Sequence, residues 1–296
     1  MNIIKFIITS LFVLSFSLNA KESSIVKHVI FIGIDGLGSH NLRHPSLKGQ
    51  TPHIDLLKSR SLWSENAQID ERNFSGPNWG AMQTGSSSEV HGVKTNNCEN
   101  GNKIPTIFDQ IKENNNSLKT AIVYEWKPVT CYAIRDDAFD KKRRSIISSS
   151  RVGKNAARLI RWHRPNFLFI DFDKVDHAGH RHNGNSKQYV KAVKRIDKEV
   201  GRILRAVQKA GIENDTAIIL SADHGHDFTG GRHSSNKHPV PLYINLPGSK
   251  GLNIDKFSYT VRNAHVAPIV AHLLGIPSSI EWEYNWEFEL YKHLLN

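Results

Sequence analysis

The feature of this sequence that most constrains its fold is a set of short, nearly unbroken apolar runs. These runs are His28–Ile34, Thr120–Tyr124, Phe167–Phe172, Thr216–Ser221 and Val240–Asn245. They lack the apolar–polar alternation of a strand that has one face in water. Such continuity is typical of strands that are buried on both faces of a parallel sheet. We therefore expect each run to be a buried strand.

Helical patterns lie between and around these runs. The expected helices are Pro52–Lys58, Ile104–Glu113, Val152–Trp162, Ser186–Lys209 and His265–Leu274. The clearest is Ser186–Lys209, which carries apolar residues at helical spacing and is followed by Gly211, a common helix terminator. Strands that alternate with helices predict an α/β fold. We expect a doubly wound, mostly parallel central sheet with helices on both faces.

The first twenty residues, MNIIKFIITSLFVLSFSLNA, match a secretory signal peptide. Lys5 precedes an apolar stretch, and the small residue Ala20 marks the expected cleavage site. The alternative is an uncleaved membrane anchor. We expect a periplasmic or secreted protein with no membrane segment after cleavage. Disulfides are permitted there, and the two cysteines, Cys98 and Cys131, could pair or stay free.

The full sequence has an apolar fraction of 39%, enough for a packed core in the remaining chain, residues 21–296. This composition excludes a wholly disordered chain, a collagen-like repeat and a small disulfide scaffold. We expect a single catalytic domain. Residues 97–150 contain polar loops and the charged segment Asp136–Arg144, so they could form a small cap over the site.

Carboxylates and imidazoles gather where the predicted strands end. Asp35 follows the first strand, Asp176 and His180 follow the third, and Asp223 and His224 follow the fourth. Ligands of doubly wound sheets bind outside the carboxyl ends of the strands, and Asp and His are ligands that Zn²⁺ accepts. Asp176 and His180 would share one face of a helical turn. The two clusters and Asp35 predict a site with more than one metal ion.

Two further segments carry candidate residues. The loop Gly230–Pro241 holds His233 and His238 just before the fifth strand, and we favour His233 as a further metal ligand. Ser75 precedes a Gly-Pro pair that opens a helix-like stretch. Helix N-termini attract anions, so Ser75 could attack a phosphorus atom held there. The alternative for Ser75 is a plain helix cap.

Taken together, these segments resemble the alkaline phosphatase superfamily in its type I phosphodiesterase/nucleotide pyrophosphatase branch. The resemblance extends from about His28 to Pro277. The segments that carry it, in chain order, are IGIDGLG at Ile32–Gly38, TPHIDLL at Thr51–Leu57, FSGPNWGAMQTGSSSEVHGV at Phe74–Val93, DFDKVDHAGHRHN at Asp171–Asn183, SADHGH at Ser221–His226, GGRH at Gly230–His233 and AHVAPIVAHLLGIP at Ala264–Pro277.

The resemblance implies a site with two zinc ions. One zinc would be held by Asp35, Ser75, Asp223 and His224, and the other by Asp176, His180 and His233. Other divalent transition metals could occupy the same ligands. The resemblance also implies that Ser75 attacks the substrate and forms a phosphoserine intermediate, while the two metals stabilise the attacking and leaving oxygens. Asn96, or its neighbour Asn97, would contact a phosphoryl oxygen.

Three residues bear on the substrate class. Ser75 stands where the diesterase branch commonly carries threonine, and phosphatases use serine. Trp79 replaces the arginine of the sulfatase motif, which argues against a sulfatase. A phosphate monoester carries more negative charge than a diester, and Lys127 could supply the matching positive charge. The alternative for Lys127 is an exposed surface lysine.

These observations predict a metal-dependent phosphoric ester hydrolase acting on a small phosphate ester, with diester hydrolysis favoured over monoester hydrolysis. A non-catalytic phosphate-binding module has less support, because every expected ligand type and the nucleophile are present. The net charge of +11 suits an anionic partner. However, the basic residues are dispersed along the chain and no nucleic-acid motif appears, so we expect no specific nucleic-acid binding. The sequence leaves the oligomeric state open.

Overall fold

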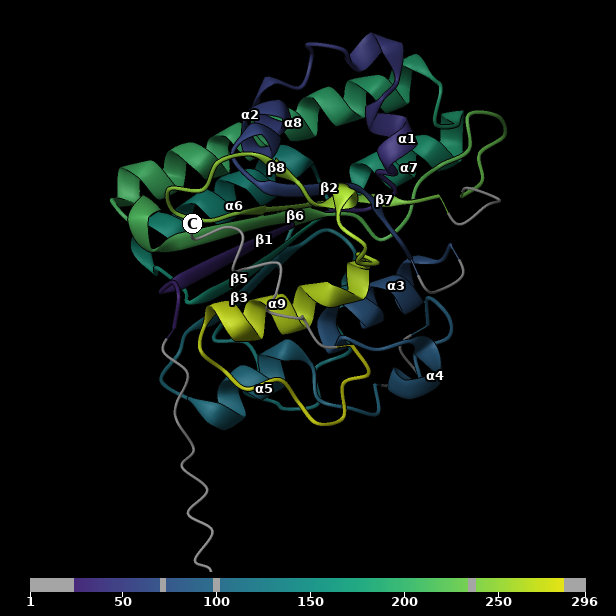
Figure 1. The fold of residues 1–296 in the computed structure, drawn as a ribbon. Helices are drawn as coiled ribbons and strands as arrows, with labels where there is room; N and C mark the ends of the chain where they lie inside the picture. The colour runs from purple at the N-terminus through teal and green to yellow at the C-terminus, as the bar shows by residue number, and fades with distance from the viewer. Residues whose placement is uncertain (1–23, 70–72, 98–101, 234–237, 285–296) are drawn as a thin grey trace, which may run out of the picture.

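The computed structural model describes residues 24–69, 73–97, 102–233 and 238–284, and these residues build a central sheet with helices on both faces (Figure 1). The described strands lie in the order β4-β3-β5-β1-β6-β7-β2-β8. Their bounds are β1 His28–Ile34, β2 Leu62–Ala67, β3 Thr120–Tyr124, β4 Lys141–Arg144, β5 Phe167–Phe172, β6 Thr216–Ser221, β7 Val240–Asn245 and β8 Leu252–Asn253. The predicted α/β fold is confirmed, and all five predicted strands have the expected bounds.

The helices form a layer on each face of the sheet (Figure 1). One layer holds α1 Ser39–Leu42, α2 Pro52–Ser59, α6 Ser149–Trp162, α7 Lys174–His182 and α8 Lys187–Ala210. The other holds α3 Ser75–Thr84, α4 Ser88–His91, α5 Ile107–Asn114 and α9 Val266–Leu273. Short 3-10 turns lie at Pro45–Leu47, Lys127–Thr130, Glu213–Asp215, Ile254–Lys256 and Asn263–His265. The five predicted helices are all present, with ends that differ by a few residues.

The middle of the sheet explains why the apolar runs are unbroken. All seven residues of β1 are buried, because β1 lies between β5 and β6 and is covered on both faces. The three strands are parallel, and Gly33 is in register with Asp171 on one side and with Ser221 on the other. The chain therefore leaves all three strands at the same edge, which is where the polar segments follow them.

The fifth predicted strand runs in the opposite direction to its neighbours. β7 pairs antiparallel with both β6 and β2, whereas its apolar run by itself suggested a parallel strand. An antiparallel neighbour needs no crossover helix. β7 therefore begins at the same edge of the sheet at which β6 ends, and the loop that connects them lies at this edge.

The segment 97–150, where a cap could have formed, contributes to the main domain. It supplies α5, β3 and β4, and β3 pairs with β5 inside the central sheet. The charged residues Lys141–Arg144 form β4, an exposed edge strand that was expected to be a loop or cap. Charged side chains at a sheet edge discourage pairing with other chains. Cys131 is part of a disulfide, and Cys98, the other cysteine of the sequence, lies outside the described residues.

The N-terminal prediction concerns residues that the structure does not describe. The expected signal peptide, residues 1–20, lies outside the described range. Within the described residues, no helix combines the length and the apolar character that crossing a bilayer requires.

A buried histidine beside α3 gives a pH prediction. His91 is fully buried at the end of α4, and its Nδ1 accepts a hydrogen bond from the Val93 N–H at 3.1 Å. Burial lowers the pKa of His91 to about 4. Between about pH 6.5 and 4 the unfolded chain binds a proton that the folded protein does not. Folding stability is therefore lost as the pH falls, by at most about 1.4 kcal/mol per pH unit from this group.

The variant His91→Asn tests this assignment, because asparagine keeps an acceptor near the Nδ1 position and cannot titrate. We expect the wild-type protein to lose roughly 2–3 kcal/mol more unfolding free energy than the variant between pH 7 and pH 4. Urea unfolding at a series of pH values measures this difference. Parallel stability curves for the two proteins would show that His91 is not the titrating group.

Candidate metal centre and active site

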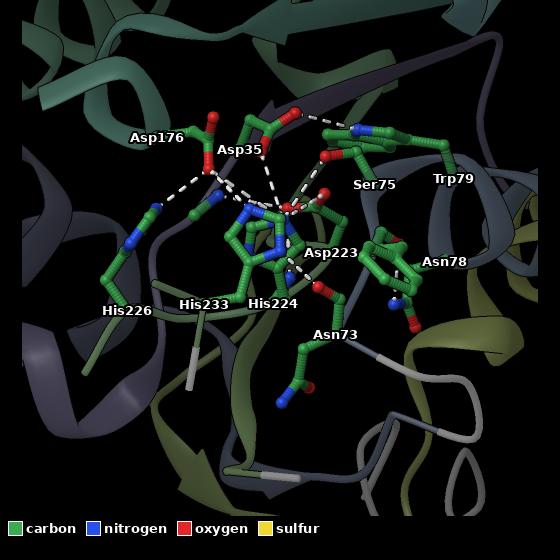
Figure 2. A network of polar contacts seen from close by, with 12 residues as sticks. Asp35, Asn73, Ser75, Asn78, Trp79, Asp176, Asp223, His224, His226 and His233 are labelled. Carbon is green, nitrogen blue, oxygen red and sulfur yellow. Dashed lines mark hydrogen bonds and ion pairs between the residues drawn. The ribbon is translucent and has the colours of Figure 1, made fainter. Parts of the chain in front are cut away.

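The residues predicted to bind metal come together at the carboxyl edge of the sheet (Figure 2). Asp35 follows β1, Asp223 and His224 follow β6, and Ser75 opens α3. Asp176 and His180 lie on α7, which follows β5, and His233 lies in the connection from β6 to β7. The parallel register of β1, β5 and β6 thus carries three distant parts of the sequence to one place.

The first group of residues surrounds the Nε2 atom of His224. Three oxygens lie 3.2, 3.3 and 3.5 Å from this atom: Ser75 Oγ, Asp223 Oδ2 and Asp35 Oδ1. Ligands at about 2.0–2.1 Å around a tetrahedral zinc lie roughly 3.3 Å apart. Asp223 Oδ2 and Asp35 Oδ1 are buried and accept no hydrogen bond. Unpaired buried carboxylate oxygens are costly, so the donor set fits a bound cation.

The second group surrounds the carboxylate of Asp176. His233 Nε2 lies 3.3 Å from Asp176 Oδ1, and His180 Nε2 lies 3.5 Å from Asp176 Oδ2. The two imidazole Nε2 atoms are themselves 2.8 Å apart. His224 Nε2 is 3.9 Å from Asp176 Oδ1, so the two groups adjoin each other. These separations also suit ligands that share one small cation.

The orientation of the imidazole rings is set by backbone carbonyls. The Nδ1 atom of each cluster histidine faces a carbonyl oxygen, in the pairs His180–Gly231, His224–Gly225, His226–Arg232 and His233–Asn73. A carbonyl oxygen only accepts, so each Nδ1 carries the proton and donates it. The Nε2 lone pairs then point into the cluster. Metal-binding histidines are commonly oriented in this way.

The electrostatics of the cluster reflect its crowded negative charge. Burial, together with the charges of Asp223 and Asp176, raises the pKa of Asp35 well above its usual value. Burial raises the pKa of Asp223 to about 7, and burial lowers the pKa of His224. Burial would raise the pKa of Asp176, but its close contacts with the imidazoles of His226, His233 and His224 lower it overall. Neutral imidazoles and anionic carboxylates are the states that bind divalent metals.

Further contacts hold the carboxylates in place. Trp79 Nε1 donates to Asp35 Oδ2 at 3.1 Å, which leaves Oδ1 for the cluster. Asp223 Oδ1 accepts from the Gly36 and His224 N–H groups at 3.0 and 2.9 Å. The sequence analysis did not assign Trp79 this role, because nothing in its spacing relates it to Asp35.

Glu125 is a second residue that the sequence analysis missed. It follows β3, and its Oε2 accepts from the Asp173 and Lys174 N–H groups at 2.7 and 3.2 Å. Glu125 therefore caps the N-terminus of α7, the helix that carries Asp176 and His180. One indication of a role for Glu125 was present in the sequence, which is its position directly after a predicted strand.

Ser75 is the first residue of α3 and is almost fully buried. It makes no helix-capping bond that would explain it as a plain cap, since α3 has Phe74 at the cap position. The next N–H, from Gly76, donates to Asn96 Oδ1 at 2.8 Å. A side chain at Gly76 would lie 2.2 Å from the Thr95 carbonyl oxygen, so glycine permits this approach. Asn96, rather than Asn97, thus lies beside Ser75.

His226 lies closer to the cluster than the sequence analysis expected. The sequence analysis assigned it no role as a ligand, yet its Nε2 lies 2.8 Å from Asp176 Oδ1. Asp176, His224, His226 and His233 form one group that could hold a metal ion, and Asp35, Asp223 and His224 form another. A side chain at Gly179 would lie 2.4 Å from the His226 ring, so the close packing of His226 on α7 needs this glycine.

Two other predicted residues lie away from the contacts described above. The ring of His238 packs on that of His40, with centroids 4.4 Å apart. Lys127 is exposed at the start of a 3-10 turn, and no ion pair involves it within the described part of the chain. The structure therefore places His233, and not His238, among the cluster residues.

Comparison with known proteins finds a family model and several relatives that match parts of the chain. Residues 108–237 match the family model of type I phosphodiesterase / nucleotide pyrophosphatase. Ectonucleotide pyrophosphatase/phosphodiesterase family member 3 of Rattus norvegicus is 28% identical over 225 residues, which are 68% of this chain and 25% of the relative. A 2,3-bisphosphoglycerate-independent phosphoglycerate mutase of Cereibacter sphaeroides is 31% identical over 121 residues, 38% of this chain and 22% of the relative. The chain spans about a quarter of the length of these relatives.

Solved structures share the fold at low sequence identity. Murine ectonucleotide pyrophosphatase/phosphodiesterase 5 superposes with a TM-score of 0.73 at 12% identity, covering 90% of this chain and 99% of the other. A putative sulfatase from Bacteroides thetaiotaomicron gives a TM-score of 0.69 at 15% identity, covering 88% and 73%. The resemblance that the motifs indicated is confirmed.

Proposed function

Because the chain is related to the type I phosphodiesterase/nucleotide pyrophosphatase family and has the alkaline phosphatase-like fold, we propose that it hydrolyses phosphate diesters in a metal-dependent reaction with Ser75 as the nucleophile. One observation carries the proposal. The hydroxyl of Ser75 lies at the N-terminus of a helix and 3.2 Å from His224 Nε2, in a cluster whose buried carboxylate oxygens Asp35 Oδ1 and Asp223 Oδ2 have no other partner.

The proposed metal ligands are those of the two groups described above. Asp35, Ser75, Asp223 and His224 would hold one zinc ion, and Asp176, His180 and His233 would hold a second. Bound metal would supply the positive charge that stabilises an ionised Ser75 hydroxyl and the departing oxygen. His226 touches Asp176 and is the nearest alternative to His180 as a ligand.

In the proposed reaction Ser75 Oγ attacks phosphorus, and the bond from phosphorus to the leaving oxygen breaks. The departing oxygen leaves as an alcohol that takes up the proton lost by Ser75. The phosphoryl group, which keeps its second ester substituent, is then carried on Ser75 as a phosphoserine ester, and water hydrolyses this ester to release a phosphate monoester and restore the hydroxyl. The first turn of α3 points its free N–H groups towards this end of the helix and favours an anion there. Asn96 binds the Gly76 N–H through Oδ1, which leaves its amide N–H groups to donate to a phosphoryl oxygen.

The surroundings of the cluster favour a diester over a monoester. A monoester dianion needs more positive charge at the phosphoryl group. Within the described residues, no Lys or Arg makes a hydrogen bond or ion pair with Asp35, Ser75, Asp176, Asp223 or His224. Lys127 remains the candidate for this charge if the substrate is a monoester. Serine at position 75 is the one feature that favours a monoesterase.

Steady-state hydrolysis of two chromogenic esters tests the proposal. With the protein lacking residues 1–20, we expect kcat/KM for bis-p-nitrophenyl phosphate to exceed that for p-nitrophenyl phosphate by about tenfold or more, a difference of ~1.4 kcal/mol in transition-state stabilisation. EDTA should abolish both activities, and Zn²⁺ should restore them.

The variant Lys127→Ala is the matched control for this assay. It should leave diester hydrolysis unchanged. A preference for the monoester that Lys127→Ala removes would move the assignment to a phosphomonoesterase. Turnover that persists in EDTA would contradict the metal-dependent mechanism.

We further propose that the protein works in the periplasm or outside the cell. The signal-peptide pattern in residues 1–20 supports this location. The names of its relatives, which are ectonucleotide pyrophosphatases/phosphodiesterases, are consistent with it.

A further inference from the structure

A cavity of about 620 Å³ lies between α7, α8 and the start of α6, and its charged lining is almost entirely basic. Lys174 and Arg181 reach it from α7, and Lys191, Arg195 and Lys198 reach it from α8. None of the carboxylates or imidazoles that form the two metal-binding groups lines this cavity. Its volume lies within the range of small-molecule binding sites.

The cations of this cavity form no close ion pair within the described residues, although Lys174 lies near enough to Glu125 and Asp173 to interact with their charges. Some exposed cations of the described chain pair with carboxylates, as in Lys94–Glu89 and Arg135–Asp137, but many others do not. No ion pair within the described residues involves any of the five cavity cations. The one acid in the lining, Glu199, is buried and bound to Arg202 at 2.7 Å. Its charge is therefore offset by a residue outside the cavity.

The fold gathers this charge from the consecutive helices α7 and α8, which lie side by side. Helix α8 contains eight Lys and Arg residues and only two acids, Asp197 and Glu199, both of which are buried. Helix α6, which packs against α8, contains four Lys and Arg residues and no acid. Like charges held together repel one another, so an anion in the cavity would relieve a cost that the folded protein otherwise carries.

The cavity also offers neutral donors and an apolar floor. The N-terminus of the 14-residue helix α6 opens onto it, and the cap residue Ser148 makes no side-chain capping bond. His177, His182 and Gln188 add polar groups at its sides, and Ala178 and Ala192 form part of its floor. Helix N-termini and arginine side chains both suit phosphate oxygens.

We propose that this cavity binds a small anion that carries several phosphate groups, at a site separate from the metal centre. A small molecule fits better than a polymer, because the five cations line one cavity of limited volume and not an extended groove. The proposal does not depend on the phosphodiesterase activity, since no cavity residue has been assigned to the reaction.

Pyridoxal 5′-phosphate gives a direct test with the metal-loaded protein. Its phosphate would bind in the cavity, and its aldehyde would condense with a nearby lysine amine, releasing water and forming an imine. Borohydride then reduces the imine to a stable secondary amine, and peptide mass spectrometry identifies the lysine. We expect labelling to concentrate on Lys174, Lys191 and Lys198, and we expect tripolyphosphate to suppress it more than sodium chloride of equal ionic strength does.

A pair of variants with the same change in charge provides the control. Arg195→Glu removes a cavity cation and should reduce labelling of the cavity lysines by about tenfold, equivalent to ~1.4 kcal/mol of binding. Arg158→Glu on α6 changes an exposed arginine that does not line the cavity, and it should change the labelling less than twofold. Hydrolysis of bis-p-nitrophenyl phosphate should be equal in both variants, which separates this site from the metal centre.

Three results would overturn the proposal. The first is that lysines all over the surface are labelled in proportion to their solvent exposure, with no preference for the cavity lysines. The two variants could reduce labelling equally, which would indicate a long-range effect of net charge. Finally, vesicles of phosphatidylglycerol could suppress the labelling where tripolyphosphate does not, which would assign the basic face to a lipid surface and not to a small anion.

Discussion

Replacing Ser75 with alanine is expected to reduce kcat for diester hydrolysis by about 10⁴-fold or more, while zinc binding persists. The change removes the attacking oxygen, and removal of a covalent nucleophile is among the largest single-residue effects on catalysis. Asp35, Asp223 and His224 remain around the same position, so most of the metal-binding group is intact. Steady-state kinetics and zinc analysis of the dialysed protein measure the two quantities.

The variant Ser75→Thr is the matched control, because it keeps a hydroxyl at the same atom. We expect it to retain measurable turnover, reduced by the extra methyl group at this buried position. Trapping of a phosphorylated residue on a peptide that contains position 75 would support the intermediate directly. Wild-type turnover in Ser75→Ala would exclude Ser75 as the nucleophile, whereas loss of both turnover and zinc would show that Ser75 acts mainly as a ligand.

The second large effect, on stability, is expected for Asp223→Asn. Without metal, the variant should unfold less easily than the wild-type protein. With zinc, it should lose most of the stabilisation that the wild-type protein gains. Burial raises the pKa of Asp223 to about 7. A raised carboxyl pKa contributes stability at low pH that is lost as the pH rises through about 7, so ionised Asp223 is destabilising at pH 8 without metal. Asparagine keeps the oxygen that accepts from Gly36 and His224 and carries no charge.

We expect the metal-free variant to gain roughly 1–3 kcal/mol of unfolding free energy at pH 8. Wild-type protein should instead gain about 4 kcal/mol from zinc at a thousand times its dissociation constant, and the variant should gain far less. Urea unfolding in EDTA and in saturating Zn²⁺ measures both effects.

Asp197→Asn serves as the control for this experiment. Asp197 is also buried, but it accepts from the His53 and Ile54 N–H groups at the start of α2, away from the cluster. Its replacement should leave the zinc response unchanged. An equal zinc response in the wild-type protein and in Asp223→Asn would contradict the assignment of Asp223 as a ligand.

The sequence was sufficient to predict five of the eight described strands and most of the cluster. Unbroken apolar runs such as His28–Ile34 are typical of strands that are covered on both faces. Parallel strands end at one edge, so Asp35, Asp176 and Asp223 could be grouped before any distance was known. The resemblance to a family then assigned Ser75 and His233 to the same place, and the structure brings both into the cluster.

Other features depended on contacts between residues that are far apart in the sequence. In the sequence His226 only flanks the ligand positions and was not counted as a ligand, yet the packing of its ring on Gly179 directs Nε2 to Asp176. Glu125 is assigned by its hydrogen bonds to the start of α7, which cross from β3 to the segment after β5. The direction of β7 follows from its pairing with β6 and not from its own apolar run.

The sequence by itself determined which segments are buried strands and which polar residues follow them, because burial and strand length are local properties of the chain. Only the tertiary structure decided which side chains meet and which charges accumulate. The basic cavity shows this most clearly: its cations come from α7 and α8, and their lack of close ion pairs within the described residues is a property of the surface and not of the sequence order. Side-chain contacts and electrostatic fields depend on distance in space, and the fold alone sets that distance.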